Sequence, residues 1–132
     1  MRRILYISTA AKGLAPRDIG TILRQSHRNN TRNGITGLLF FDGVRFLQAL
    51  EGDAAALDKT LERIRSDPRH LGIVILNDKN IDKRQFDDMA MASYVWNGTE
   101  NARSAQKIDR LVAKVEDQDL KYQFRSFADI RG

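Results

Sequence analysis

A glutamine at position 48 lies among apolar residues, where its side-chain amide must find polar partners. Two apolar segments flank Asp42-Gly43, a dipeptide that predicts a tight hairpin turn. Alternate residues of the second strand share a face, so Gln48 lies beside Phe46 and Leu50 on the more apolar face. A buried donor or acceptor without a partner costs about 1–3 kcal/mol. We therefore expect protein or a ligand to meet Gln48.

Polar residues on two other elements follow the same pattern. In a strand expected over Arg2–Thr9, Tyr6 and Ser8 are the polar members of one face. In a helix expected from Pro16 to about Arg32, the apolar stripe ends in the amide of Asn30. A buried tyrosine usually has an ordinary hydrogen-bond partner, and Asn30 could bond local backbone at the helix end. These residues alone therefore leave a structural and a ligand-binding reading open.

A second helix is expected between Asp53, its N-cap, and Pro68. Thr60, Arg63 and Asp67 lie along one flank of it. Without other evidence, Arg63 and Asp67 read as an exposed i,i+4 ion pair that contributes a few tenths of a kcal/mol.

The rest of the chain completes the predicted fold. GIVILN at Gly72–Asn77 predicts a central strand covered on both faces, followed by a charged connection at 78–88 and a weaker strand at Met89–Tyr94. A helix is expected over 102–115 and a shorter amphipathic stretch over 120–130. This order predicts an α+β, ferredoxin-like βαββαββ sheet. The first two helices cover one face, and the C-terminal helices cover the other face or contact a partner.

Strand parity brings the polar residues together. Tyr6, Ser8 and Gln48 fall on the face covered by the first two helices, which also carry Asn30 and Arg63. Polar groups from separate elements thus converge on one interior region. A ring-shaped ligand rich in donors and acceptors, inserted between the helices, would satisfy them together.

Composition narrows the class of protein. The 132 residues suit one domain, and the chain has no Cys and only two His. We therefore expect no disulfide, no thiolate chemistry and no metal site, and a cytoplasmic location. The short apolar run at the N-terminus predicts neither a secretory signal nor a membrane span. The net charge of +5 raises nucleic-acid binding as an option, but the basic residues are mixed with acidic ones.

Five short stretches, in this order, carry a resemblance to a known family. They are LYIS with Tyr6 and Ser8, NNTRNGITGLL with Asn29 and Asn30, FLQALEG with Gln48, Arg63 with the DPRH run at Asp67–His70, and KRQFDDMAM with Met91. Over about Arg2–Ser93 the chain resembles a BLUF domain, a blue-light sensor that uses FAD. The resemblance implies a flavin-binding domain over residues 1–95 and a C-terminal helical extension over 96–132.

The resemblance also implies roles for individual residues. Asn30 and Arg63 would bind the pyrimidine edge of the flavin ring, and Gln48 would bridge Tyr6 and the flavin. The remaining cofactor contacts would come from Ser8, Ile22, Ser26, Asn29, Asp67 and His70. The cofactor would be FAD, with FMN as the alternative, since no phosphate-cradling glycine loop is visible.

In such domains, Tyr6 would give up an electron and then a proton through Gln48 after excitation. The rearranged Gln48 would change its hydrogen bond to the flavin and shift the absorption to the red. Met91 would pass the change to the C-terminal helices. Family members often carry Trp two positions before this Met, but here that residue is Met89. Met91 or the C-terminal helices must then carry the signal, or Trp96 substitutes from a shifted register; we expect Met91, because it keeps the spacing of the family.

The resemblance is to short, free-standing members, which predicts a separate effector protein and a homo-oligomer rather than an enzyme. The alternative is an RRM-like nucleic-acid-binding module, which shares the order of elements. However, the strand VRFLQALE offers only Phe46 for base stacking, and no K/R-G-F run precedes it. The RRM-like alternative is therefore disfavoured.

Overall fold

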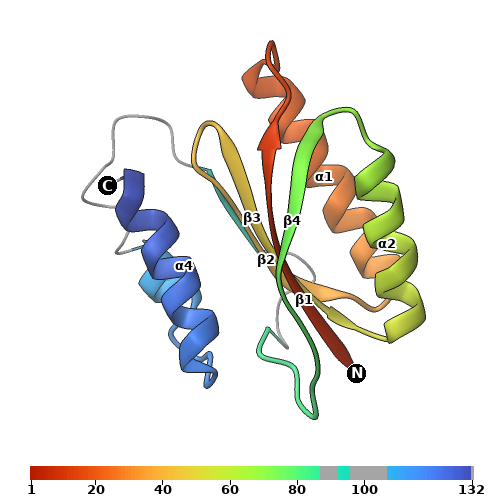
Figure 1. Ribbon diagram of the computed structural model, residues 1–132, viewed down its shortest axis with the longest axis vertical. Helices are drawn as coiled ribbons and strands as arrows, with labels where there is room; N and C mark the ends of the chain where they lie inside the picture. Colours follow the sequence, from red (N-terminus) through yellow and green to blue (C-terminus); the bar gives the residue numbers. More distant parts are fainter. Residues whose placement is uncertain (87–91, 96–106, 132) are drawn as a thin grey trace.

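The computed structural model describes residues 1–86, 92–95 and 107–131. Its elements are β1 (Arg2–Ala10), α1 (Pro16–Arg32), β2 (Thr36–Phe41), β3 (Arg45–Gly52), α2 (Ala54–Ser66), β4 (His70–Asn80), β5 (Ala92–Val95) and α4 (Gln118–Arg131). The strands form one sheet in the order β4-β1-β3-β2-β5. This arrangement confirms the predicted ferredoxin-like βαββαββ fold (Figure 1).

The turn between β2 and β3 forms for the reason that its sequence suggests. Gly43 has a φ of 99°, a backbone conformation that residues other than glycine rarely adopt. The Asp42 carboxylate accepts hydrogen bonds from the backbone N–H groups of Val44, at 2.9 Å, and Arg45, at 2.6 Å. The turn fixes the antiparallel register of β2 and β3, in which Leu39 lies opposite Gln48.

Helices α1 and α2 cover one face of the sheet, as predicted (Figure 1). Pro16 begins α1, where the Asp18 carboxylate accepts a 2.7 Å bond from the Ala15 N–H. Asn33 and Gly34, which has a φ of 66°, end the helix. The core beneath the two helices consists of Ile4, Tyr6, Ile19, Ile22, Ile35, Leu39, Phe41, Phe46, Leu50 and Leu57.

The C-terminal part of the chain covers the opposite face, which confirms the first of the two predicted placements. Helix α4 and the helical residues 107–111 pack there (Figure 1). Phe127 of α4 meets Phe40 edge to face, with ring centroids 5.1 Å apart. This second core consists of Leu5, Leu38, Phe40, Leu47, Ala49, Phe86, Ile108, Val112, Val115, Leu120, Phe124 and Phe127.

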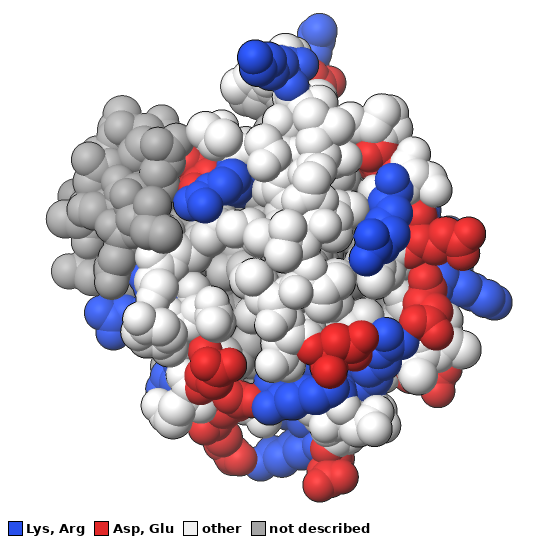
Figure 2. All heavy atoms as spheres, in the orientation of Figure 1, with Lys and Arg blue, Asp and Glu red and all other residues white. Residues whose placement is uncertain are grey.

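The prediction of a central strand at Gly72–Asn77 is wrong. β4 is longer than predicted, so residues 78–80 of the expected charged connection belong to it, and it lies at one edge of the sheet. Leu71, Val74 and Leu76 are 49%, 53% and 43% exposed. Figure 2 shows the charged residues around the margin of this side and mostly uncharged atoms in its middle, over β4. A short apolar run indicates a strand but not its position in the sheet.

Toward the C-terminus, one predicted boundary differs from the structure, and several predicted residues lie outside the described range. Of the helix predicted over 102–115, residues 107–111 are helical and residues 112–114 form a turn that leads to α4, whereas residues 102–106 lie outside the described residues. Met89, Met91 and Trp96 lie outside the described residues. No helix among the described residues has both the length and the apolar character needed to cross a membrane.

Candidate functional site

A cavity of about 350 Å³ lies between α1, α2 and the start of β4. Eight of the predicted site residues line it: Ile22, Ser26, Asn29, Asn30, Gln48, Arg63, Asp67 and His70. The other lining residues are Gln25, Thr60, Ile64, Ser66, Pro68 and Arg69. The elements predicted to converge therefore do converge. Tyr6 and Ser8 do not line the cavity. They are buried behind Gln48 and His70, to which they bond.

Tyr6 and Gln48 form a hydrogen-bonded pair behind the cavity wall. β1 and β3 are antiparallel neighbours in which Tyr6 lies opposite Gln48. The Tyr6 hydroxyl donates a hydrogen bond to Gln48 Oε1. Burial raises the pKa of the Tyr6 phenol above its ordinary value of 10.0, and the Asp67 carboxylate raises it further. Tyr6 is therefore a neutral phenol whose hydroxyl proton is directed at the amide oxygen of Gln48.

Ser8 and His70 form a second pair beside the first. Ser8 Oγ lies 3.1 Å from His70 Nδ1, and the His70 ring packs against Phe46 with centroids 4.7 Å apart. Burial lowers the pKa of His70 below its ordinary value of 6.5, and Arg69 lowers it further, whereas Asp67 raises it. The imidazole is therefore neutral near pH 7.

Two buried polar atoms on facing helices have no hydrogen-bond partner among the described residues. They are Asn30 Nδ2 on α1 and Thr60 Oγ1 on α2, and both residues line the cavity. The backbone oxygen of Asn30 accepts the helix-end bonds from Asn33 and Ile35, so its side-chain nitrogen is not used for local capping. Groups of this kind are costly unless a ligand meets them. The cavity thus fits a ring that carries both donors and acceptors.

Asp67 pairs with Arg69, so the interpretation of Arg63 and Asp67 as an ion pair is wrong. The Arg69 guanidinium binds both Asp67 oxygens, at 2.6–3.0 Å, and donates to Gln25 Oε1 at 2.8 Å. The hydrogen bond from Arg69 lowers the pKa of Asp67. Helical spacing does not apply here, because α2 ends at Ser66. Arg69 lies in the loop that follows, where its guanidinium reaches both Asp67 and Gln25 of α1. Arg63 is exposed at the cavity lining.

Gln25 and Arg69 line the cavity, but neither was predicted from the sequence as a site residue. Gln25 adjoins Ser26 and lies one helical turn before Asn29, so helical spacing contained a signal for it. Arg69 lies inside the DPRH run, but its link across to Gln25 depends on the path of a loop. Sequence periodicity does not describe such a path.

Comparison with known proteins identifies the family of this fold and site. The family model described as "BLUF: Sensors of blue-light using FAD" matches residues 1–92. A curated relative, the photoactivated adenylate cyclase subunit beta of Euglena longa, is 34% identical over 83 residues. The match covers 63% of this chain and 10% of the relative, so the chain corresponds to about a tenth of that protein's length.

Two solved structures extend the similarity over nearly the whole chain. BlrB, described as a BLUF protein in its dark state, has a TM-score of 0.75 and 31% identity, and the match covers 96% of this chain and 94% of BlrB. The BlrP1 BLUF structure has a TM-score of 0.80 and 27% identity, with 99% and 89% covered. These matches support a flavin-based light sensor rather than an enzyme domain or an RRM-like module.

Proposed function

The chain belongs to the BLUF family of blue-light sensors, and we propose that it binds FAD noncovalently in the cavity between α1 and α2. The observation that carries the placement of the flavin is a pair of buried, unpartnered atoms, Asn30 Nδ2 and Thr60 Oγ1, whose residues line that cavity from α1 and α2. FMN is the alternative, because FMN and FAD share the ring and the ribityl chain. Chromatography of the flavin released by denaturation distinguishes the two forms.

Particular residues would hold the flavin. Asn30 and Gln48 offer amide donors and acceptors, and Arg63 offers a cation for a ring carbonyl. Arg69, held by Asp67 and Gln25, ties the loop before β4 to α1 and so positions this side of the cavity. The remaining predicted contacts, including Ile22, Ser26, Asn29 and His70, would pack around the ring and the ribityl chain.

When bound, the flavin would supply blue-light absorption and, once excited, an acceptor for one electron. Tyr6 supplies that electron, because the phenol is an oxidisable group that lies directly behind the cavity wall. Loss of an electron makes the phenol strongly acidic, and its hydrogen bond directs the proton to Gln48 Oε1. Return of an electron and of the same proton would restore Tyr6 and could leave Gln48 rotated. If the returning proton instead comes from the amide nitrogen and Oε1 keeps the one from Tyr6, Gln48 would be left as its imidic tautomer. The altered Gln48 hydrogen bond would shift the absorption to the red.

The signal would then leave the pocket through the strand that follows. We propose that Met91 carries it, with Met89 and Trp96 as further members of the relay, toward the C-terminal helices. The output would be light-dependent contact with a separate effector protein or a change in a homo-oligomer. The photoactivated adenylate cyclase relative supports the proposal of an effector. In that relative, the region matched by this chain is only 10% of a longer protein.

An absorption spectrum before and after blue light tests the proposed function. We expect a flavin spectrum that shifts to the red as a whole and recovers in the dark. Tyr6→Phe removes the hydroxyl that bonds Gln48, and should keep the bound flavin but abolish the shift. Tyr122→Phe is the matched control, because Tyr122 on α4 is 66% exposed. A colourless protein that cannot be loaded with flavin, or a full shift in Tyr6→Phe, would contradict the proposal.

A further inference from the structure

A buried carboxylate lies on β3, on the face opposite the flavin cavity. Glu51 is 0% exposed and lies three residues after Gln48 on the same strand. Its Oε1 accepts bonds from Thr36 Oγ1 at 2.8 Å and from the Phe86 N–H at 2.6 Å, and its Oε2 accepts the Gln85 N–H at 2.8 Å. Glu51 therefore fixes the backbone of the segment that follows β4.

The same segment holds the start of α4. Gln85 Oε1 accepts bonds from the backbone N–H groups of Glu116, at 2.6 Å, and Asp117, at 3.3 Å. Phe86 is buried and meets Phe124 of α4 with ring centroids 6.4 Å apart. Residues 85 and 86 thus bind β3 through their backbone and bind the α4 region through their side chains.

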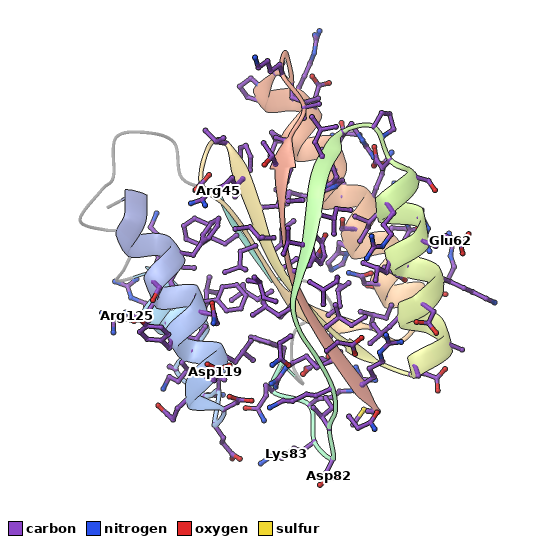
Figure 3. All side chains as sticks on the ribbon, viewed as in Figure 1. Arg45, Glu62, Asp82, Lys83, Asp119 and Arg125 are labelled. Carbon is purple, nitrogen blue, oxygen red and sulfur yellow. The ribbon has the colours of Figure 1, made fainter. Side chains whose placement is uncertain are left out.

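Asp117 completes the attachment at the first turn of α4. Its Oδ1 accepts the Leu120 N–H at 3.2 Å, and its Oδ2 binds Arg3 at 2.5 Å and Lys79 at 2.8 Å. Hydrogen bonds from Lys79 and Arg3 hold the pKa of Asp117 well below its usual range. Figure 3 shows Lys83, which pairs with Glu116 at 2.9 Å, at the same end of the molecule as Asp119 of α4.

We propose that Glu51 and Gln85 form a latch that positions α4 on the sheet and couples this docking to the strand that carries Gln48. The coupling rests on the proposed light-sensing function. A shift in β3 after rearrangement of Gln48 displaces the Glu51 carboxylate relative to the N–H groups of Gln85 and Phe86 and weakens these two hydrogen bonds. The Gln85 amide then loses its alignment with residues 116 and 117. Opening of the latch weakens the docking of α4 and exposes its apolar face.

Amide hydrogen exchange on the flavin-loaded protein, in the dark and under blue light, tests the latch. Gln85→Ala removes the acceptor for Glu116 and Asp117 and keeps the backbone bonds to Glu51. Loss of one such bond should speed exchange over α4 about fivefold in the dark, with the amides of β1 and β3 unchanged. Tyr122→Ala is the matched control, because Tyr122 lies on the same helix and is 66% exposed.

The change in amide exchange under blue light distinguishes a latch that responds to the flavin from a contact that only holds α4 in place. In the wild type, light should speed exchange over α4, and this increment should shrink in Gln85→Ala and in Glu51→Gln while their flavin red shift remains. The latch would be overturned if the dark exchange rate over α4 is unchanged in Gln85→Ala, or if exchange rises equally over the whole sheet. It would also be overturned if both variants keep the full light-induced increase in exchange over α4. A wild-type spectrum that does not shift would overturn the proposed function, and the dark rates would still decide whether the latch holds α4.

Discussion

Thr60 offers a sharp test of the cavity, because one substitution should change stability and flavin affinity in opposite directions. Its Oγ1 is buried on α2 with no hydrogen-bond partner among the described residues. Thr60→Val replaces the hydroxyl with a methyl group of nearly the same size. The flavin-free protein no longer buries an unpaired hydroxyl, whose cost is about 1–3 kcal/mol. We expect the free energy of unfolding of this form to rise by about 1 kcal/mol.

The affinity for flavin should fall in Thr60→Val, although the stability of the flavin-free protein rises. Loss of one hydrogen bond in the cavity weakens affinity about tenfold, since 1.4 kcal/mol corresponds to that factor. At a free flavin concentration of 100 times the wild-type Kd, binding stabilises the wild type by about 2.7 kcal/mol and the variant by only about 1.4 kcal/mol. The advantage of Thr60→Val without flavin should therefore disappear in its presence.

Urea unfolding with and without flavin, together with a fluorescence titration, measures both effects. Thr21→Val on α1 is the control, because the Thr21 hydroxyl bonds the Arg17 carbonyl at 3.0 Å at an exposed site. It should change stability by less than about 0.5 kcal/mol and leave affinity unchanged. A Thr60→Val protein that is less stable without flavin and binds flavin as tightly as the wild type would refute the reasoning. The hydroxyl would then have a partner other than the ligand.

Two further predictions concern the frame of the site. Gly43→Ala should lower the free energy of unfolding by about 1–2 kcal/mol in urea, because its φ of 99° is strained for alanine; Gly20→Ala, inside α1 and facing only a flexible Arg24, should not lower it. Because burial lowers the pKa of His70, stability should be fully present above pH 6.5 and fall as the pH drops through that lowered pKa. Urea midpoints in His70→Gln should show a smaller decline, and an equal decline would assign the effect to other groups.

The sequence predicted the layers of the fold better than the position of each strand. Alternation in β1 and β3 and helical spacing in α1 correctly assigned residues to faces, because these periods follow from local backbone geometry. The apolar run of β4 gave a strand but suggested the wrong environment. Val74 lies opposite Ile7 of β1, yet Val74 and Leu76 are exposed because the packing on that face does not extend over β4. Apolar composition does not distinguish an edge strand from a central one.

Predictions for the site succeeded or failed according to the kind of geometry that sets each contact. Tyr6 and Gln48 were placed on one face by parity, and the register of β1 and β3 brings them directly opposite each other. Asp67 was assigned to Arg63 by helical spacing, but its partner is Arg69, because α2 has ended and a loop determines the geometry. Regular elements can be extrapolated along the chain, whereas loops depend on contacts made elsewhere.

This dependence on register makes the hydrogen bond between Tyr6 and Gln48 sensitive to distant changes. A slip of one residue between β1 and β3 would move Gln48 to the α4 face and bring Leu47 or Ala49 opposite Tyr6. The register of β3 is in turn fixed by the Asp42-Gly43 turn at one end and by the bonds of Glu51 at the other. The hydrogen bond between Tyr6 and Gln48 is therefore maintained by the whole strand. Substitutions in the Asp42-Gly43 turn, far from the cavity, should alter the light-induced red shift before they abolish flavin binding.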